Sequence, residues 1–379
     1  MTVSDALRLA HGFTVADLAT RDGLIRLDRH FLQTLADHDA ALHQRLLAAR
    51  ATPEALARRD ESDLVVALGP HLDAFIATVF GIEPETDALL RETQALDPIH
   101  ACKRLFVQRQ AVKKYPDPSG FDGTALRAAL ESRIGAPLTE QAFATTTWET
   151  DPEALDEALR YAAWATLTPD GQAHHSGGTL FRVPHRVDPQ HLVPVETIEH
   201  DGVTMLRLPE HDWRHREGFA LTDHGMNRQQ ALDQVNYCIW CHTQGKDSCS
   251  LGLKDRKTGA FQQSPFGVTL AGCPLDEKIS EMHTLRAQGH VLGAFATIVI
   301  DNPMMAATGH RICNDCMKAC IYQKQDPVDI PQAETSILKD ILALPWGFEI
   351  YALLTKWNPL DLRRPLPRPD TGRKVLVVG

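Results

Sequence analysis

The chain has 379 residues, of which 43% are hydrophobic and 23% charged; this is typical of a soluble globular protein and too apolar for a disordered one. Its length exceeds what one ordinary hydrophobic core holds and predicts two or three domains. Its 39 basic and 49 acidic side chains give a formal net charge of −10, which argues against a nucleic-acid-binding surface.

Residues 1–170 are predicted to form a helical domain to which we assign no chemistry. A set of apolar residues recurs there at spacings of three, four or seven, which places them on one helix face. They are Leu24, Leu27, Phe31, Leu35, Leu42 and Leu46. Further helices are expected over 63–80, 86–114 and 152–166. Cys102 stands apart from the other cysteines, and we expect it to be an ordinary buried thiol.

Residues 171–225 are predicted to be a β-containing connector. Two β-rich runs, 192–199 and 203–208, flank the pair Asp201-Gly202, which is a typical hairpin turn. Four histidines of this part are of the residue type that binds metals, but histidines in polar loops are usually solvated, and we expect no metal there. They are His174, His175, His211 and His215.

The other cysteines fall within residues 226–345 and give the most specific signal in the sequence. They are Cys238, Cys241, Cys249, Cys273, Cys313, Cys316 and Cys320. No signal peptide and no run of about 18 uninterrupted apolar residues is evident, so we expect a cytoplasmic protein without a membrane span. In a reducing cytosol, clustered cysteines indicate metal or redox chemistry rather than disulfides.

Three chemistries compete for these thiols. Two C-x2-C pairs are able to clamp zinc, although seven thiolates do not divide into four-ligand sites. The run Cys238 to His242 reads C-x-x-C-H, the haem attachment pattern, but it leaves five cysteines unused. A pair of [4Fe–4S] clusters uses all seven cysteines and needs one further ligand. We take two clusters as the leading interpretation and a zinc-stabilised interaction module without redox chemistry as the alternative.

Further motifs stand in a fixed order around the cysteines. They are Gly272-Cys273-Pro274-Leu275, Asp301-Asn302-Pro303, Thr308-Gly309-His310-Arg311-Ile312-Cys313, Pro327-Val328-Asp329-Ile330 followed by Glu334, and Thr371-Gly372-Arg373-Lys374-Val375. In this order, residues 232–379 resemble the amino-terminal helical ferredoxin segment of the glutamate synthase small (β) subunit, and a similar segment at the front of dihydropyrimidine dehydrogenase. The resemblance implies an α-helical ferredoxin domain over 226–345.

The resemblance also implies two sets of cluster ligands. The first set is Cys238, Cys241, Cys249 and Cys320. The second set is Cys273, Cys313, Cys316 and Glu334, in which the carboxylate supplies the ligand that seven cysteines lack. Five basic residues near these ligands in sequence are expected either to offset the negative charge of the clusters or to be solvated. They are Lys246, Lys254, His310, Arg311 and Lys318.

The chain departs from the family pattern at two places. The family has only a few residues between the third cysteine and the Cys-Pro pair, whereas 23 residues separate Cys249 from Cys273 here. An insertion of this length is tolerable as a surface loop, because the entropy of loop closure grows slowly with length. The run from Cys313 to Cys320 is C-x2-C-x3-C, one residue shorter than the common family form, which leaves open which cysteine serves which cluster.

Residues 346–372 are predicted to be an amphipathic helix and a linker. Residues 373–379 have the composition of the first strand of a Rossmann-type FAD/NAD(P)-binding domain, with Gly379 as the first glycine of its phosphate-binding turn. The expected fold is therefore mainly α, with a small β-hairpin insertion and the truncated start of a Rossmann strand. The resemblance implies that FAD and NAD(P)H bind in a downstream domain, not in this chain, and that a flavoprotein subunit is a possible electron acceptor. On this interpretation the chain is part of an NAD(P)H-dependent FAD/iron–sulfur oxidoreductase.

Overall fold

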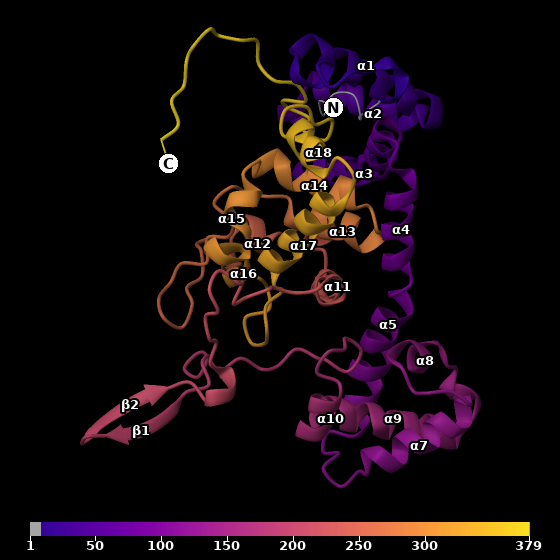
Figure 1. Cartoon of the computed structure of the whole chain (residues 1–379), viewed down its shortest axis with the longest axis vertical. Coiled ribbons are helices and arrows are strands. Elements are labelled where there is room, and N and C mark those ends of the chain that lie inside the picture. Colours follow the sequence, from indigo (N-terminus) through magenta and orange to yellow (C-terminus); the bar gives the residue numbers. More distant parts are fainter. Residues whose placement is uncertain (1–8, 379) are drawn as a thin grey trace.

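The structure, a computed structural model, describes residues 9–378 apart from the side chains of His211, His310 and Arg311. Gly379, the predicted cofactor-binding glycine, lies outside the described residues. The described chain is mainly helical with one small antiparallel hairpin, as predicted (Figure 1).

The helices are α1 (Arg21–His38), α2 (Ala40–Ala51), α3 (Arg58–Phe80), α4 (Glu83–Gln94), α5 (Asp97–Cys102), α6 (Val112–Lys114), α7 (Gly123–Ile134), α8 (Glu140–Thr145), α9 (Pro152–Leu167), α10 (Pro169–His174), α11 (Arg228–Tyr237), α12 (Ser248–Leu251), α13 (Ile279–Gln288), α14 (Val291–Asp301), α15 (Met305–Ile312), α16 (Asp315–Lys318), α17 (Ile330–Ala343) and α18 (Gly347–Leu354). The strands are β1 (Glu196–His200) and β2 (Val203–Arg207).

Local sequence explains where these helices begin. Thr20 and Asp39 accept hydrogen bonds from the first turns of α1 and α2. The six apolar residues predicted to share a helix face are divided between these two helices, and all six are buried. The single helix predicted over 86–114 is instead interrupted after α4, because Pro98 starts a new helix, and it continues through a π-helical stretch at Lys103–Ala111.

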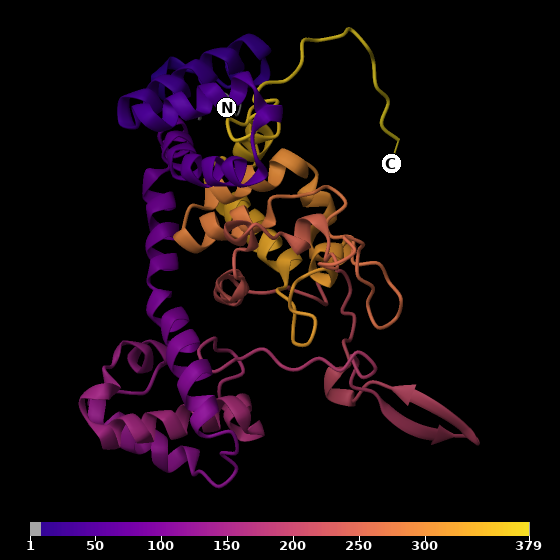
Figure 2. The ribbon, with the colours of Figure 1, turned by 180° about the vertical axis from the view of Figure 1, so that it is seen from behind.

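The first hydrophobic core joins the two ends of the chain. Helices α1–α4 pack with α13, α14, α17 and α18, as seen from both sides of the molecule (Figures 1 and 2). At its centre Trp357 packs edge-on against Phe31, with ring centroids 6.1 Å apart, and its indole N–H donates to Asp28 at 3.0 Å. Gly69 and Gly293 let α3 and α14 approach closely, because a Cβ on Gly293 would lie 2.8 Å from the backbone oxygen of Gly69.

The second core is built from one continuous part of the chain, between Ile99 and Phe181. Aromatic rings dominate it, with Phe143 packed against Phe106, Trp148 and Phe181 at centroid distances of 5.2–5.7 Å. The predicted helical domain 1–170 thus supplies residues to both cores. The predicted boundaries at 170/171, 225/226, 345/346 and 372/373 stay predictions.

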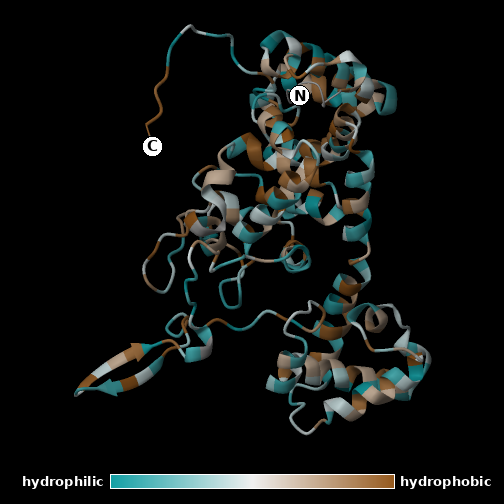
Figure 3. Cartoon of the chain, viewed as in Figure 1, coloured by the Kyte–Doolittle hydropathy of each residue, from teal (hydrophilic) through white to brown (hydrophobic). Residues whose placement is uncertain are grey.

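The predicted hairpin is present and projects away from the helices (Figures 1 and 3). Asp201 and Gly202 both have positive φ, at 50° and 77°, as a two-residue hairpin turn requires. Both strands are shorter than predicted and largely exposed, since no other described strand pairs with them.

Two apolar segments bear on the predicted absence of a membrane span and on the predicted Rossmann strand. Helix α3 is long and apolar enough to cross a membrane, but most of it is buried in the first core, which accounts for its composition. Residues 373–378 have no regular secondary structure, and Val375 to Val378 are more than four-fifths exposed. The Rossmann strand expected there stays a prediction.

Candidate functional site

The first set of predicted ligands comes together around one small cavity. Cys238 ends α11, Cys241 opens a short 3₁₀ turn, Cys249 lies in α12 and Cys320 follows α16. All four thiols line the cavity and lie within electrostatic range of one another. The structure therefore groups Cys320 with the three early cysteines, despite the shortened run before it.

The environment of these thiols combines burial with backbone donors. Burial raises the pKa of Cys238 to about 12 and that of Cys241 to about 11. In the opposite direction, the N–H of Trp240 donates to the Cys238 sulfur at 3.4 Å. The Cys320 sulfur accepts from three backbone N–H groups, those of Ile321, Tyr322 and Val328. These donors favour anionic sulfur and oppose part of the effect of burial on the thiol pKa values.

Two charged residues near the first set carry no sequence signal. Asp247 is buried and accepts a hydrogen bond from the Cys249 thiol at 3.5 Å. Arg58, at the start of α3, pairs with Asp247 at 2.9 Å and donates to Ser250 at 2.8 Å. Arg58 is 189 residues away in sequence, so only the fold brings it to the cysteines.

Two histidines also belong to this part of the site. His242, the histidine of the C-x-x-C-H run, is buried and shares a hydrogen bond with Ser280 Oγ at 2.6 Å through Nδ1. His283 is fully buried and lines the cavity of the four thiols, and neither of its ring nitrogens has a hydrogen-bond partner. Buried polar atoms without a partner are uncommon and point to a group that would satisfy them.

The second set of predicted ligands also comes together. Cys273 precedes α13, Cys313 ends α15, Cys316 lies on α16 and Glu334 lies on α17. Cys316 interacts electrostatically with Cys273 and Glu334, and Glu334 with Cys313. Cys316 is buried whereas Cys313 is exposed, so this set opens to solvent at one ligand.

The carboxyl of Glu334 has a second carboxyl beside it, which sequence reasoning missed. Glu334 is hydrogen-bonded to Glu277, and Glu277 is also hydrogen-bonded to Asn302. Burial, followed by the charge of Glu277, raises the pKa of Glu334 well above its usual range. Glu277 lies four residues after Cys273, a spacing that carries no signal without the fold.

The two sets are joined through the backbone. The N–H of Cys273 donates to the carbonyl of Cys249 at 2.8 Å. The 23-residue insertion between them is a largely exposed loop whose ends meet, as the N–H of Leu253 donates to the carbonyl of Leu270 at 2.9 Å. The insertion is therefore a surface loop, as predicted, and it keeps the two sets adjacent.

The basic residues predicted near the ligands differ in what they contact. Lys246 lowers the pKa of Cys241 through its charge, against the larger effect of burial. Lys254 lies over the ring of Phe261 at 5.4 Å, and Lys318 pairs with exposed Asp315 at 2.8 Å. The side chains of His310 and Arg311 lie outside the described residues.

The distances between these side chains indicate which kind of metal site they are able to form. Among the described residues, no three His, Cys, Asp or Glu side chains converge closely enough to hold a single ion. The ligands of a [4Fe–4S] cluster bind different iron atoms and stand further apart than the ligands of one ion. The described histidines of the connector, His174, His175 and His215, form no such group either, and His175 instead shares a hydrogen bond with Tyr161 at 3.0 Å.

Comparisons with known proteins find relatives whose function is not described. Residues 9–81 match the model of the RP005 N-terminal alpha-helical domain. The uncharacterized protein RP005 of Rickettsia prowazekii is 32% identical over 287 residues, covering 70% of this chain and 94% of RP005. The uncharacterized protein RP006 of the same organism is 64% identical over 76 residues, 20% of this chain and 11% of RP006. No solved structure matches.

Proposed function

This chain belongs to the RP005 family, and we propose that it is an iron–sulfur electron-transfer protein that holds two [4Fe–4S] clusters. The observation that carries the proposal is the sorting of seven cysteines and Glu334 into two sets of four. Cys320 lies with Cys238, Cys241 and Cys249 although Cys316 is much closer to it in sequence. This crossing of ligands between runs is the pattern of two-cluster ferredoxins.

The donor atoms fit such clusters. The first set offers four soft sulfurs that accept backbone N–H groups, and His283 supplies an unpaired ring nitrogen in the same cavity. The second set offers three sulfurs and a buried carboxyl. When bound, such clusters accept and release single electrons.

The residues of the chain would hold the clusters and tune their potential. The N–H groups at Trp240 and Tyr322 stabilise negative charge on sulfur, which raises a potential, whereas the Asp247 carboxylate beside Cys249 opposes it. Arg58 offsets part of the Asp247 charge. Three thiols of the first set are buried and Cys238 is half-buried, whereas Cys313 of the second set is exposed. We infer that the second set is where electrons enter or leave.

The wider role follows from the resemblance to the glutamate synthase small subunit. We propose that the chain is part of a cytoplasmic NAD(P)H-dependent oxidoreductase whose FAD and NAD(P)H are bound by another domain. A flavoprotein subunit is the proposed acceptor. The chain spans about a tenth of RP006, so RP006 contains much that this chain does not match.

Metal and sulfide analysis of the anaerobically purified chain tests the proposal. We expect about eight iron atoms and eight acid-labile sulfides per chain, with broad visible absorbance that dithionite bleaches. Stoichiometric zinc without sulfide would overturn the proposal in favour of a zinc-stabilised interaction module. A colourless protein lacking both metals would overturn it as well.

A further inference from the structure

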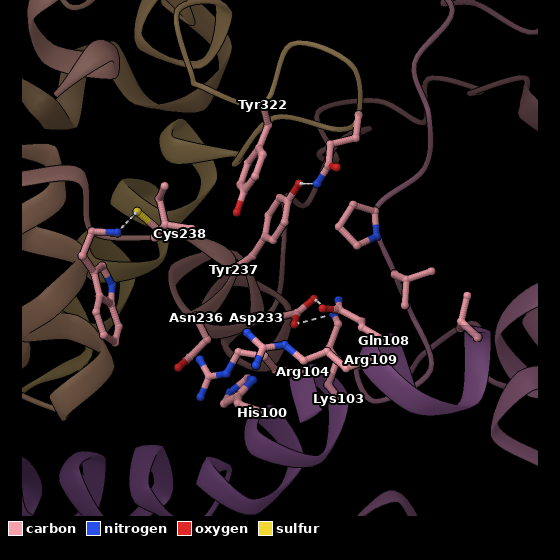
Figure 4. Close-up of a pocket in the computed structure, with 16 residues that line it drawn as sticks. His100, Lys103, Arg104, Gln108, Arg109, Asp233, Asn236, Tyr237, Cys238 and Tyr322 are labelled. Atoms are coloured by element: carbon pink, nitrogen blue, oxygen red, sulfur yellow. Dashed lines mark hydrogen bonds and ion pairs between the residues drawn. The ribbon is translucent and has the colours of Figure 1, made fainter. Parts of the chain in front are cut away.

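A cavity of about 530 Å³ lies where the second core meets the first set of cysteines. Its walls come from α5, the π-helical stretch Lys103–Ala111, α11 and the segment around Tyr322. Figure 4 shows His100, Arg104 and Arg109 on the side opposite the rings of Tyr237 and Tyr322. The volume falls within the range of about 300–1,000 Å³ that is typical of small-molecule sites.

The π-helical stretch gives this cavity two unpaired cations. In a π-helix the backbone bonds to the fifth residue along, so Arg104 and Arg109 lie one turn apart on the same side. No acidic side chain in the described part of the chain pairs with either guanidinium. Lys103 differs, because Asp233 neutralises it at 2.6 Å. The two arginines are thus free to bind an anion, and guanidinium groups bind phosphate in bidentate fashion.

Two buried polar groups at this cavity have no partner. His100 is 6% exposed, and neither of its ring nitrogens makes a hydrogen bond. The indole N–H of Trp240, which also lines the cavity, has no acceptor. A buried donor without an acceptor is unfavourable, so these groups favour a ligand that carries both donors and acceptors.

Aromatic side chains form the remaining wall. Tyr237 and Tyr322 are stacked with ring centroids 4.6 Å apart and an interplanar angle of 7°. Trp240 lines the cavity as well. Three aromatic side chains at one cavity suit a planar ring system.

We propose that this cavity binds a phosphate-bearing heteroaromatic molecule of the nucleotide class. Its phosphate would lie on Arg104 and Arg109, its ring against Trp240 and Tyr322, and its polar ring edge within reach of His100. The assignment depends on the cavity alone and not on the clusters. Cys238 also lines the cavity, so on the proposed function the bound ring would lie beside a cluster ligand.

Titration of the full chain with flavin mononucleotide and with adenosine diphosphate tests the proposal, by quenching of flavin fluorescence and by calorimetry. We expect one of the two to bind saturably, which also distinguishes a flavin ring from an adenine ring. Riboflavin, which lacks the phosphate, and inorganic phosphate, which lacks the ring, should each bind more weakly. The double variant Arg104→Gln/Arg109→Gln should weaken binding about tenfold or more, because each charge-assisted bond contributes strongly.

The double variant Arg29→Gln/Arg45→Gln is the matched control, since both arginines are exposed on α1 and α2 and unpaired among the described residues. It removes the same charge and should leave binding unchanged. Equal weakening by both double variants, or no binding of either nucleotide at millimolar concentration, would overturn the proposal. Iron content, measured on the same samples, reports separately on the proposed clusters.

Discussion

The two hydrophobic cores of this protein are assembled in opposite ways. The first core takes helices from residues 9–94 and combines them with residues 226–366, and it contains Cys249, Cys316 and Cys320. The second core uses the continuous segment between Ile99 and Phe181, and its cysteine is the solitary Cys102. The comparison shows that the cysteine sets depend on helices near the start of the chain, which lie outside the ferredoxin-like resemblance.

The cores also differ in what they bury. Ionisable groups lie deep within the first core, where Arg286 is 1% exposed and pairs with Asp340, and Asp73 accepts from the N–H of Gly293 at 2.9 Å. The second core is held by aromatic contacts such as those of Phe143. The first core thus combines cysteines with buried charged groups, whereas the second combines aromatic packing with part of the cavity wall.

Removal of Cys320 should have the largest effect, because only the first core contains the proposed cluster ligands. Cys320→Ala leaves the first set with three sulfurs, so iron should fall from about eight to about four atoms per chain. Cys102→Ala is the control from the second core, where burial raises the pKa of the thiol to about 12. Its iron content should match the parent protein. Equal iron in Cys320→Ala and the parent would contradict the ligand assignment.

Replacement of Glu334 tests whether the two sets of ligands hold two separate clusters. Glu334→Gln keeps the shape of the side chain but removes the anionic ligand, so the redox signal of one cluster should shift while the other stays unchanged. Electron paramagnetic resonance of the reduced protein measures this, with Glu85→Gln as the control, because Glu85 is exposed on α4. If neither signal changes, Glu334 is not a ligand.

The buried pair of Lys103 and Asp233 connects the two cores. Lys103→Met leaves the Asp233 carboxylate buried without its partner and should lower the free energy of unfolding by about 3–5 kcal/mol. Lys103→Met/Asp233→Leu removes both charges and should recover most of that loss. Urea unfolding followed by circular dichroism measures both values. A single variant as stable as the parent would show that the buried pair does not stabilise the protein.

Asp73 gives the first core a dependence on pH. Burial, opposed by the N–H groups of Gly293 and Leu292, raises the pKa of Asp73 to about 7. The unfolded chain, with an aspartate pKa of about 3.9, releases this proton earlier, so the contribution of Asp73 is complete below pH 4 and lost as pH rises toward 7. The shift sets an upper limit of about 4 kcal/mol.

Asp73→Asn should therefore gain stability relative to the parent between pH 4 and pH 8. Urea midpoints of the two proteins, measured side by side across this range, test the direction. A constant difference between them would mean that Asp73 titrates alike in the folded and unfolded states.

The same substitution, glycine to alanine, can be made once in each core to compare their effects on stability and on iron retention. Gly293→Ala would push α14 against α3, and Gly123→Ala would push α7 against the ring of Trp164. Each should lower the free energy of unfolding by about 1–3 kcal/mol, but only Gly293→Ala should speed iron loss on heating. Gly120→Ala, where a Cβ meets nothing within 4 Å, is the control. Equal iron loss from both variants would contradict the separation of the cores.

Local signals in the sequence predicted much of the fold. The apolar spacing of Leu24 to Leu46 predicted buried helix faces, and Asp201-Gly202 predicted the hairpin. The helix faces and the hairpin turn are both determined by residues that are neighbours in the sequence, so a local pattern is enough to predict them. The joining of α3 to α14 depends on Gly69 and Gly293, more than 200 residues apart, and no local pattern predicts which distant helix meets which.

The candidate site shows the same limit. The proposed thiol and carboxyl ligands are visible in the sequence as residue types, and each of the two sets that the resemblance implies lies together in the structure. Asp247, Glu277 and His283 are ordinary polar residues in sequence, and they join the site because folding buries them beside the ligands. The arginines of the nucleotide-sized cavity share a face because of a π-helical stretch that no periodic pattern indicated.

Reductive titration of the anaerobic protein with dithionite tests the central claim most directly, because it counts electron-accepting centres. Two clusters predict bleaching of the visible absorbance after about two electrons per chain in the parent and about one in Cys320→Ala. A chain that takes up no electrons, with its seven clustered thiols reduced and bound to zinc or to nothing, would contradict the account.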